Sequence, residues 1–148
     1  MAIFHFNPTV ARIRLRVEIV GDRRRTLDML LDTGATRTTI PLWAAEEIGI
    51  PPHASERRVE TTTASDTIEA PIVTVPSVHA FGHTVENIEV LCLDLPPSLC
   101  IDGLLGLNFL SRFKLFVHFP KGVLIIQRPS KNPFANSIQV WELLKAAL

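Results

Sequence analysis

Apolar and polar residues alternate from Ile13 to Val20, where Ile, Leu and Val take every second place among arginines and a glutamate. This period of two is typical of a half-buried antiparallel strand, and the pattern extends back to residue 10. Gly21 and the charged residues that follow it predict a turn. Residues 26–31 then predict the returning strand of a hairpin.

Short apolar stretches punctuated by glycine or proline continue as far as residue 127. They predict further strands, with turns between them, at residues 72–75, 77–81, 85–93, 115–119 and 123–127. The polar, threonine-rich stretch 57–70 predicts a long exposed hairpin. Together these elements predict an all-β domain that is mainly antiparallel.

Helices are predicted at three places. Residues 41–48 are mostly helix formers, with Pro41 suited to the first helical position and Gly49 to the C-terminal cap. Residues 103–113 predict a glycine-bounded loop that runs into a short helix.

The third helix is expected at the C-terminus, over residues 134–148, after a polar linker at 129–133. Its apolar residues fall on one stripe, namely Ile138, Trp141, Leu144 and Leu148. The chain therefore divides into a domain over residues 1–128 and a linker with a terminal helix over residues 129–148. We expect the stripe to dock on the core, with a partner or dimer contact as the alternative, and Trp43 and Trp141 to pack in the core or between helices.

Charge and composition narrow the function classes. The 148 residues carry fifteen basic and fifteen acidic side chains, which disfavours nucleic acid or a membrane surface as partner. The five histidines and two cysteines form no metal-ligand motif, so we expect no metal and no cofactor. The cysteines are expected as free buried thiols. With no signal-like N-terminus, they favour a cytoplasmic location.

The informative motif is the sequence Leu-Leu-Asp-Thr-Gly-Ala at residues 30–35. An apolar strand ends abruptly in the carboxylate of Asp32, and Gly34 lets the chain turn sharply and lets a ligand approach the backbone. An aspartate that caps a turn is the simpler alternative. However, holding an unpaired carboxylate beside buried surface costs free energy. Its presence at this point therefore calls for a functional explanation.

A second motif, Ile-Asp-Gly-Leu-Leu-Gly-Leu-Asn-Phe-Leu, follows about seventy residues later, at 101–110. With these two motifs, residues 10–127 resemble the retropepsin-like aspartic proteases, in the style of the bacterial and cellular members. The resemblance implies a closed β-barrel of the acid-protease type, with short helices and a β-hairpin flap over the site. It implies an aspartic endopeptidase.

Proteases of this kind activate water with two carboxyls that share a proton, and this chain has a single Asp-Thr-Gly. The resemblance therefore implies a homodimer with one Asp32 from each copy. Thr33 would support the pair across the dimer, and Gly34 would accept the substrate backbone. The residues expected to line the peptide subsites are Leu30, Ala35, Thr36, Arg37, Asp102 and Leu104, together with Ala64, Ser65 and Asp66 at the flap tip.

The chain departs from the family pattern at three places. Thr36 and Leu107 stand where retroviral enzymes carry a paired Asp and Arg, and the tip at residues 64–66 has neither glycine nor tyrosine. The hairpin could thus be a solvated surface loop, and Asp102 could simply form a turn before Gly103. Two functional alternatives follow: a catalytically weak peptide-binding or dimerisation module, and a protease that its own tail holds inactive.

Overall fold

The computed structural model describes residues 1–132 and 141–146. The predicted first hairpin is present: strands β2 (Arg14–Val20) and β3 (Arg24–Leu31) pair antiparallel. Leu15, Val17 and Ile19 point into the core, as the alternation predicts. No helix in the described residues has the length and apolarity to cross a bilayer.

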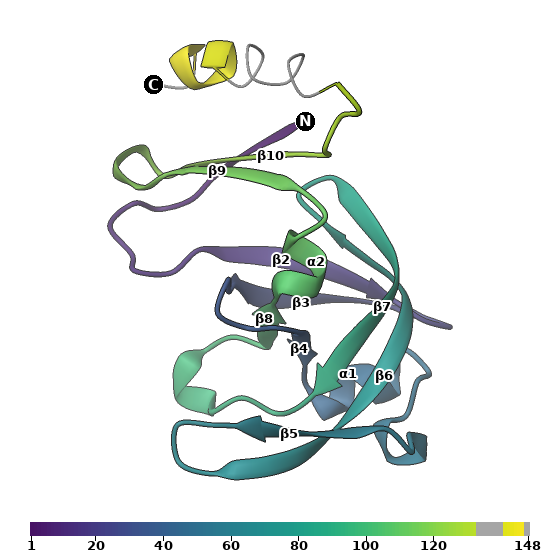
Figure 1. Ribbon diagram of the computed structural model, residues 1–148. Coiled ribbons are helices and arrows are strands. Elements are labelled where there is room, and N and C mark those ends of the chain that lie inside the picture. The colour runs from purple at the N-terminus through teal and green to yellow at the C-terminus, as the bar shows by residue number, and fades with distance from the viewer. Residues whose placement is uncertain (133–140, 147–148) are drawn as a thin grey trace.

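Two long strands run along the right-hand side of the molecule in Figure 1, β6 (Thr67–Ala80) and β7 (His83–Cys92), joined at Phe81 and Gly82. Both turn residues have positive φ, 54° and 74°, as a tight two-residue hairpin turn requires. The sequence predicted two strands where β6 is continuous, and that prediction is wrong. Pro76 is tolerated because the pairing register skips it, so its missing N–H removes no ladder bond.

Six strands close into a barrel in the order β2-β3-β8-β4-β7-β6, and β6 returns to pair with β2. The predicted fold class is confirmed. Strand β8 (Gly103–Leu105) lies between β3 and β4 (Thr38–Ile40), parallel to the first and antiparallel to the second. A loop was predicted for this part of residues 103–113, and β4 was not foreseen. Both strands have only three residues, too few to show an alternation of apolar and polar positions.

Strand β5 (Arg58–Thr62) pairs only with β6 and forms a hairpin outside the barrel. The helical segments are short: α1 (Leu42–Glu47), η1 (Pro52–Ala54), η2 (Pro97–Leu99), α2 (Leu107–Leu110) and η3 (Phe119–Lys121). Pro41 is the N-cap of α1, not its first helical residue. Trp43 is 39% exposed, because α1 buries Ala44 and Ala45 instead; its expected core position is wrong.

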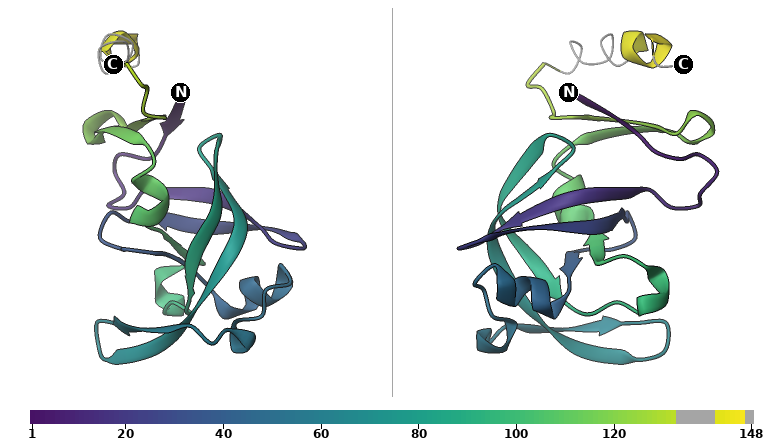
Figure 2. Two further views of the ribbon diagram at one scale, coloured as in Figure 1. Left: turned by 45° about the vertical axis from the view of Figure 1, so that its right-hand side comes forward. Right: turned by 180° about the vertical axis from the view of Figure 1, so that it is seen from behind.

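A second sheet lies across one end of the barrel (Figure 2), in the order β1-β10-β9. It contains the predicted last hairpin, β9 (Lys114–His118) and β10 (Val123–Gln127), and the N-terminal strand β1 (Ala2–His5), which the sequence did not reveal. Residues 141–146 are helical. Trp141 is 61% exposed and not in the core as expected, while Ile138 and Leu148 lie outside the described residues.

The two cysteines differ in environment. Cys92 is buried, as predicted, but Cys100 is exposed at the end of η2, where its φ is 53°. Burial raises the pKa of the Cys92 thiol to about 12. Cys92 is therefore a packed apolar side chain at neutral pH.

Candidate active site

Asp32 stands at the point where β3 leaves the barrel, and its conformation is fixed by neighbours on both sides. Its backbone N–H donates to Leu105 O on β8 (3.0 Å), and its Oδ1 accepts the N–H of Gly34 (2.8 Å). Ala35 N–H donates back to Asp32 O (3.3 Å). The half-buried carboxylate thus sits in a short, self-bonded turn, and we call residues 32–37 the active-site loop.

The second motif supports this loop from beneath. Leu107 N–H donates to Ala35 O (2.8 Å), and Asn108 N–H donates to Thr36 O (3.2 Å). A Cβ at Gly106 would lie 2.6 Å from the carbonyl oxygen of Arg37 and 2.8 Å from that of Ala35. Only glycine lets the two segments approach this closely.

Asn108 links three elements. Its Oδ1 accepts the backbone N–H and the Oγ1–H of Thr38, each at 2.9 Å, and its Nδ2 donates to Glu89 O on β7 (2.6 Å). Thr38 is fully buried, so these bonds satisfy polar groups that are out of contact with solvent. Asn108 belongs to the quoted second motif, but sequence reasoning assigned it no role.

Five of the expected subsite residues lie in the active-site loop or on the two strands beside Asp32, namely Leu30, Ala35, Thr36, Arg37 and Leu104. Leu30 and Leu104 are register partners on β3 and β8, and both are half-buried. They lie on the strand face opposite to Met29, which points into the barrel. Thr33, Gly34 and Thr36 are exposed and Ala35 and Arg37 are half-buried, so the loop presents a polar surface beside an apolar pair.

The predicted hairpin is present, and we call β5, residues 63–66 and the start of β6 the flap hairpin, after the role that the family resemblance leads us to expect for it. Its turn is closed by Thr63 N–H donating to Asp66 O (2.7 Å), while Asp66 N–H donates to Thr63 Oγ1 (3.1 Å). Ala64, Ser65 and Asp66 are exposed at the tip. The hairpin turn, the loop between β3 and β4, and η2 lie on one side of the molecule (Figures 1 and 2).

Asp102 has a structural role. Its Oδ2 accepts the backbone N–H of Asp28 (2.8 Å), and its own N–H donates to Asp28 O (2.7 Å). Asp28 in turn pairs with Arg14. The carboxylate that was expected to contact substrate is therefore engaged with the backbone of β3, and these bonds join two strands rather than close a turn before Gly103.

Glu89 is a further functional candidate that the sequence did not reveal. Its Oε1 lies 2.6 Å from Arg57 Nη1, and its Oε2 lies 3.7 Å from Arg37 Nε. The hydrogen bond from Arg57 lowers the pKa of Glu89, and the charges of Arg57 and Arg37 act in the same direction. The three residues are far apart in the chain, so no local pattern could have predicted the contact.

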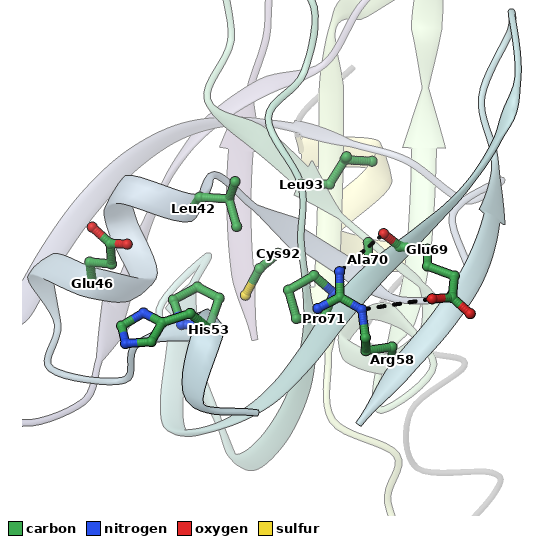
Figure 3. A pocket seen from close by; sticks show the side chains of 10 residues that line it. Leu42, Glu46, His53, Arg58, Glu69, Ala70, Pro71, Cys92 and Leu93 are labelled. Carbon is green, nitrogen blue, oxygen red and sulfur yellow. Dashed lines mark hydrogen bonds and ion pairs between the residues drawn. The ribbon is translucent and has the colours of Figure 1, made fainter. Parts of the chain in front are cut away.

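A pocket of about 350 Å³ lies elsewhere, at the root of the flap hairpin (Figure 3). Leu42, Leu93, Cys92 and Pro71 supply apolar walls, and Glu46, His53, Arg58 and Glu69 supply polar ones. None of its lining residues belongs to the active-site loop. Within residues 1–132 and 141–146, no group of three or more His, Cys, Asp or Glu side chains could hold a metal ion.

Comparison with known proteins identifies the fold and the family. A family model described as an aspartyl protease matches residues 15–109, well over half of the chain. The chain belongs to this aspartyl protease family. The matched segment of this family member contains both Asp32 and Asn108.

A solved structure agrees with this assignment. The chain is similar to the crystal structure of a retropepsin-like aspartic protease from Rickettsia conorii, with a TM-score of 0.66 and 23% identity. The match covers 85% of this chain and 89% of that one. No curated protein sequence matches significantly. The two sequence motifs predicted a retropepsin-like aspartic protease, and this prediction is confirmed.

Proposed function

We propose that this protein is an aspartic endopeptidase that acts as a homodimer, with one Asp32 from each copy in a shared site. The observation that carries the proposal is the geometry of Asp32. Its backbone is bonded to β8 and its Oδ1 to Gly34 N–H, at the exposed end of a buried strand. A carboxylate held this firmly beside an exposed glycine is preorganised for chemistry.

One chain supplies only half of the catalytic pair. Two carboxylates about 3 Å apart would repel by roughly 5 kcal/mol at an effective dielectric constant near 20, so the pair retains one proton. The ionised carboxylate then takes a proton from the attacking water, and the protonated one donates a hydrogen bond to the scissile carbonyl. Exposed Thr33, beside Asp32, is available to bond across the two-fold axis beneath the pair.

The substrate is an extended peptide that lies between the active-site loop and the flap hairpin as an added strand. Exposed Gly34 accepts its backbone, and the half-buried pair Leu30 and Leu104 receives an apolar side chain. The hairpin turn is closed by its own hydrogen bonds at Thr63 and Asp66. It can therefore act as a flap without a glycine at its tip.

Sedimentation and a peptide-library cleavage assay between about pH 4 and 7, on one sample, test the proposal. We expect a dimer whose cleavage is lost in Asp32→Asn while sedimentation is unchanged. Because the pair works with one proton, the rate should fall on both the acid and the alkaline side. Cleavage that survives Asp32→Asn contradicts the mechanism. A dimer that binds library peptides without cleaving them supports the binding-module alternative.

A further inference from the structure

Three charged side chains from three different elements meet beside the active-site loop. Arg37 belongs to the loop itself, Glu89 to β7, and Arg57 to the residue just before the flap hairpin. Glu89 contacts both arginines, Arg57 at 2.6 Å and Arg37 at 3.7 Å. The cluster therefore joins the floor of the proposed peptide site to the root of its flap.

The charges in this cluster do not balance, since two guanidinium groups share one carboxylate. The hydrogen-bonded partner of Glu89 is Arg57. At 3.7 Å, the contact to Arg37 is an ion pair without a hydrogen bond of normal length. Two guanidinium groups facing one carboxylate leave the cluster with a net positive charge. Arg37 makes no hydrogen bond of normal length to Glu89, and its side chain is 36% exposed.

The backbone on both sides of the ion pair is locked. Arg37 packs its carbonyl against Gly106, and the next residue, Thr38, is held by Asn108. The same Asn108 donates to the carbonyl oxygen of Glu89 at 2.6 Å. Arg37 and Glu89 are therefore fixed relative to each other through their main chains, which reduces the entropy lost when a ligand is bound.

Building on the proposed function, we propose that Arg37 selects peptides carrying an aspartate or glutamate side chain. Arg57 is a positioning residue: it occupies Glu89 and so leaves Arg37 available to the substrate. A carboxylate matches the planar fork of a guanidinium and forms charge-assisted hydrogen bonds with it. Glu89 competes with the substrate carboxylate and limits the strength of the selection.

The neighbouring ion pair provides a matched control. Arg58 follows Arg57 directly in sequence, but it pairs with Glu69 across the flap hairpin, one cation to one anion. Arg58→Gln therefore removes the same charge at the adjacent position without altering the Glu89 contacts. A purely long-range charge effect would move both variants alike, whereas the proposed contact distinguishes them.

The probe is a decapeptide library that carries Glu, Gln, Lys or Leu at one position at a time. Cleavage by the full chain is read by mass spectrometry, and binding to the full chain and to Asp32→Asn by fluorescence anisotropy. At one position we expect a preference for Glu over Gln of about tenfold, the ratio that corresponds to 1.4 kcal/mol. Arg37→Gln should bring the ratio close to 1.

The other variants test the shared carboxylate. Arg57→Gln should lower the ratio because Glu89 then turns to Arg37, Glu89→Gln should raise it, and Arg58→Gln should leave it unchanged. An equal ratio in the wild type and in Arg37→Gln overturns the inference, as does an equal fall in Arg57→Gln and Arg58→Gln.

The two readouts separate this inference from the proposed function. Cleavage without any acidic preference refutes the role of Arg37 and leaves the peptidase assignment intact. Arg37-dependent acidic preference in binding, without cleavage, supports the inference and refutes the peptidase assignment. A chain that neither binds nor cleaves any library member overturns both.

Discussion

Asn108 and Thr38 lie seventy positions apart in the chain, yet one side-chain oxygen of Asn108 accepts both the backbone N–H and the hydroxyl of Thr38 at 2.9 Å. Thr38 is fully buried. This contact holds the end of the active-site loop against α2. The geometry of the candidate site therefore depends on Asn108, a residue outside the active-site loop.

Asn108→Ala should lower the free energy of unfolding by about 2–4 kcal/mol, because it leaves the buried donors of Thr38 unpaired. Asn7→Ala is the matched control, since Asn7 Oδ1 also accepts a threonine N–H and Oγ1–H, those of Thr9, but in an exposed position. We expect a loss below about 1 kcal/mol there. Urea unfolding measures both, and equal losses would contradict the structural role of Asn108.

Two glycines near Asp32 should respond differently to alanine. Gly106→Ala should unfold or strongly destabilise the chain, because its Cβ would meet backbone atoms at 2.6 Å. In Gly34→Ala the added Cβ would lie near only one atom, the Oδ1 of Asp32, at 3.2 Å. We therefore expect a folded protein with impaired peptide cleavage. Thermal unfolding and the library assay report on the two effects, and normal cleavage by Gly34→Ala would count against close substrate approach there.

Mixing experiments test the shared site. If both carboxyls are needed and subunits exchange, a ninefold excess of Asp32→Asn chains should reduce wild-type cleavage to about one tenth, since most wild-type chains then sit in mixed dimers. An equal amount of an unrelated protein serves as the control. Sedimentation of differently labelled chains monitors the exchange of subunits. Activity that stays unreduced after exchange would show that a single Asp32 is sufficient.

The cysteines should differ in reactivity. At pH 8 only about one part in ten thousand of Cys92 is thiolate with its pKa near 12, so a thiol reagent should label exposed Cys100 alone. Two labels per chain are expected in denaturant. Rapid labelling of both in the folded protein would contradict the burial of Cys92.

The same pKa shift predicts a pH effect on stability. The folded thiol keeps its proton above pH 9, the ordinary pKa of a cysteine thiol, while the unfolded one releases it. Stability should therefore fall by about 1 kcal/mol between pH 8 and pH 10. The loss should be smaller in Cys92→Ala, which lacks the titrating group. An identical slope in the two proteins would assign the effect to other groups.

Truncation after Arg128 tests the autoinhibitory alternative. None of the described residues beyond it is buried, so we expect the shortened chain to remain folded. A gain in cleavage would show that the tail restrains the site. Loss of the folded state, seen by circular dichroism, would instead show that the tail contributes to the core.

The sequence predicted the elements whose information is local. The alternation around Leu15 and Val17 predicted the first hairpin, and the Asp-Thr-Gly at residue 32 indicated the candidate site. The sequence did not predict the features that depend on contacts between distant parts of the chain. Buried Thr38 in β4 depends on Asn108 to accept its two donors, and Glu89 joins the candidate site through arginines distant in the chain.

The placement of β8 between β3 and β4 has a consequence for biosynthesis. Leu105, whose carbonyl anchors the backbone of Asp32, emerges from the ribosome about seventy residues later, or roughly 4–14 seconds at 5–20 residues per second. Until then the backbone of Asp32 lacks its hydrogen bond to β8. The site of the proposed peptidase would therefore stay incomplete on a nascent chain until residue 105 has been made.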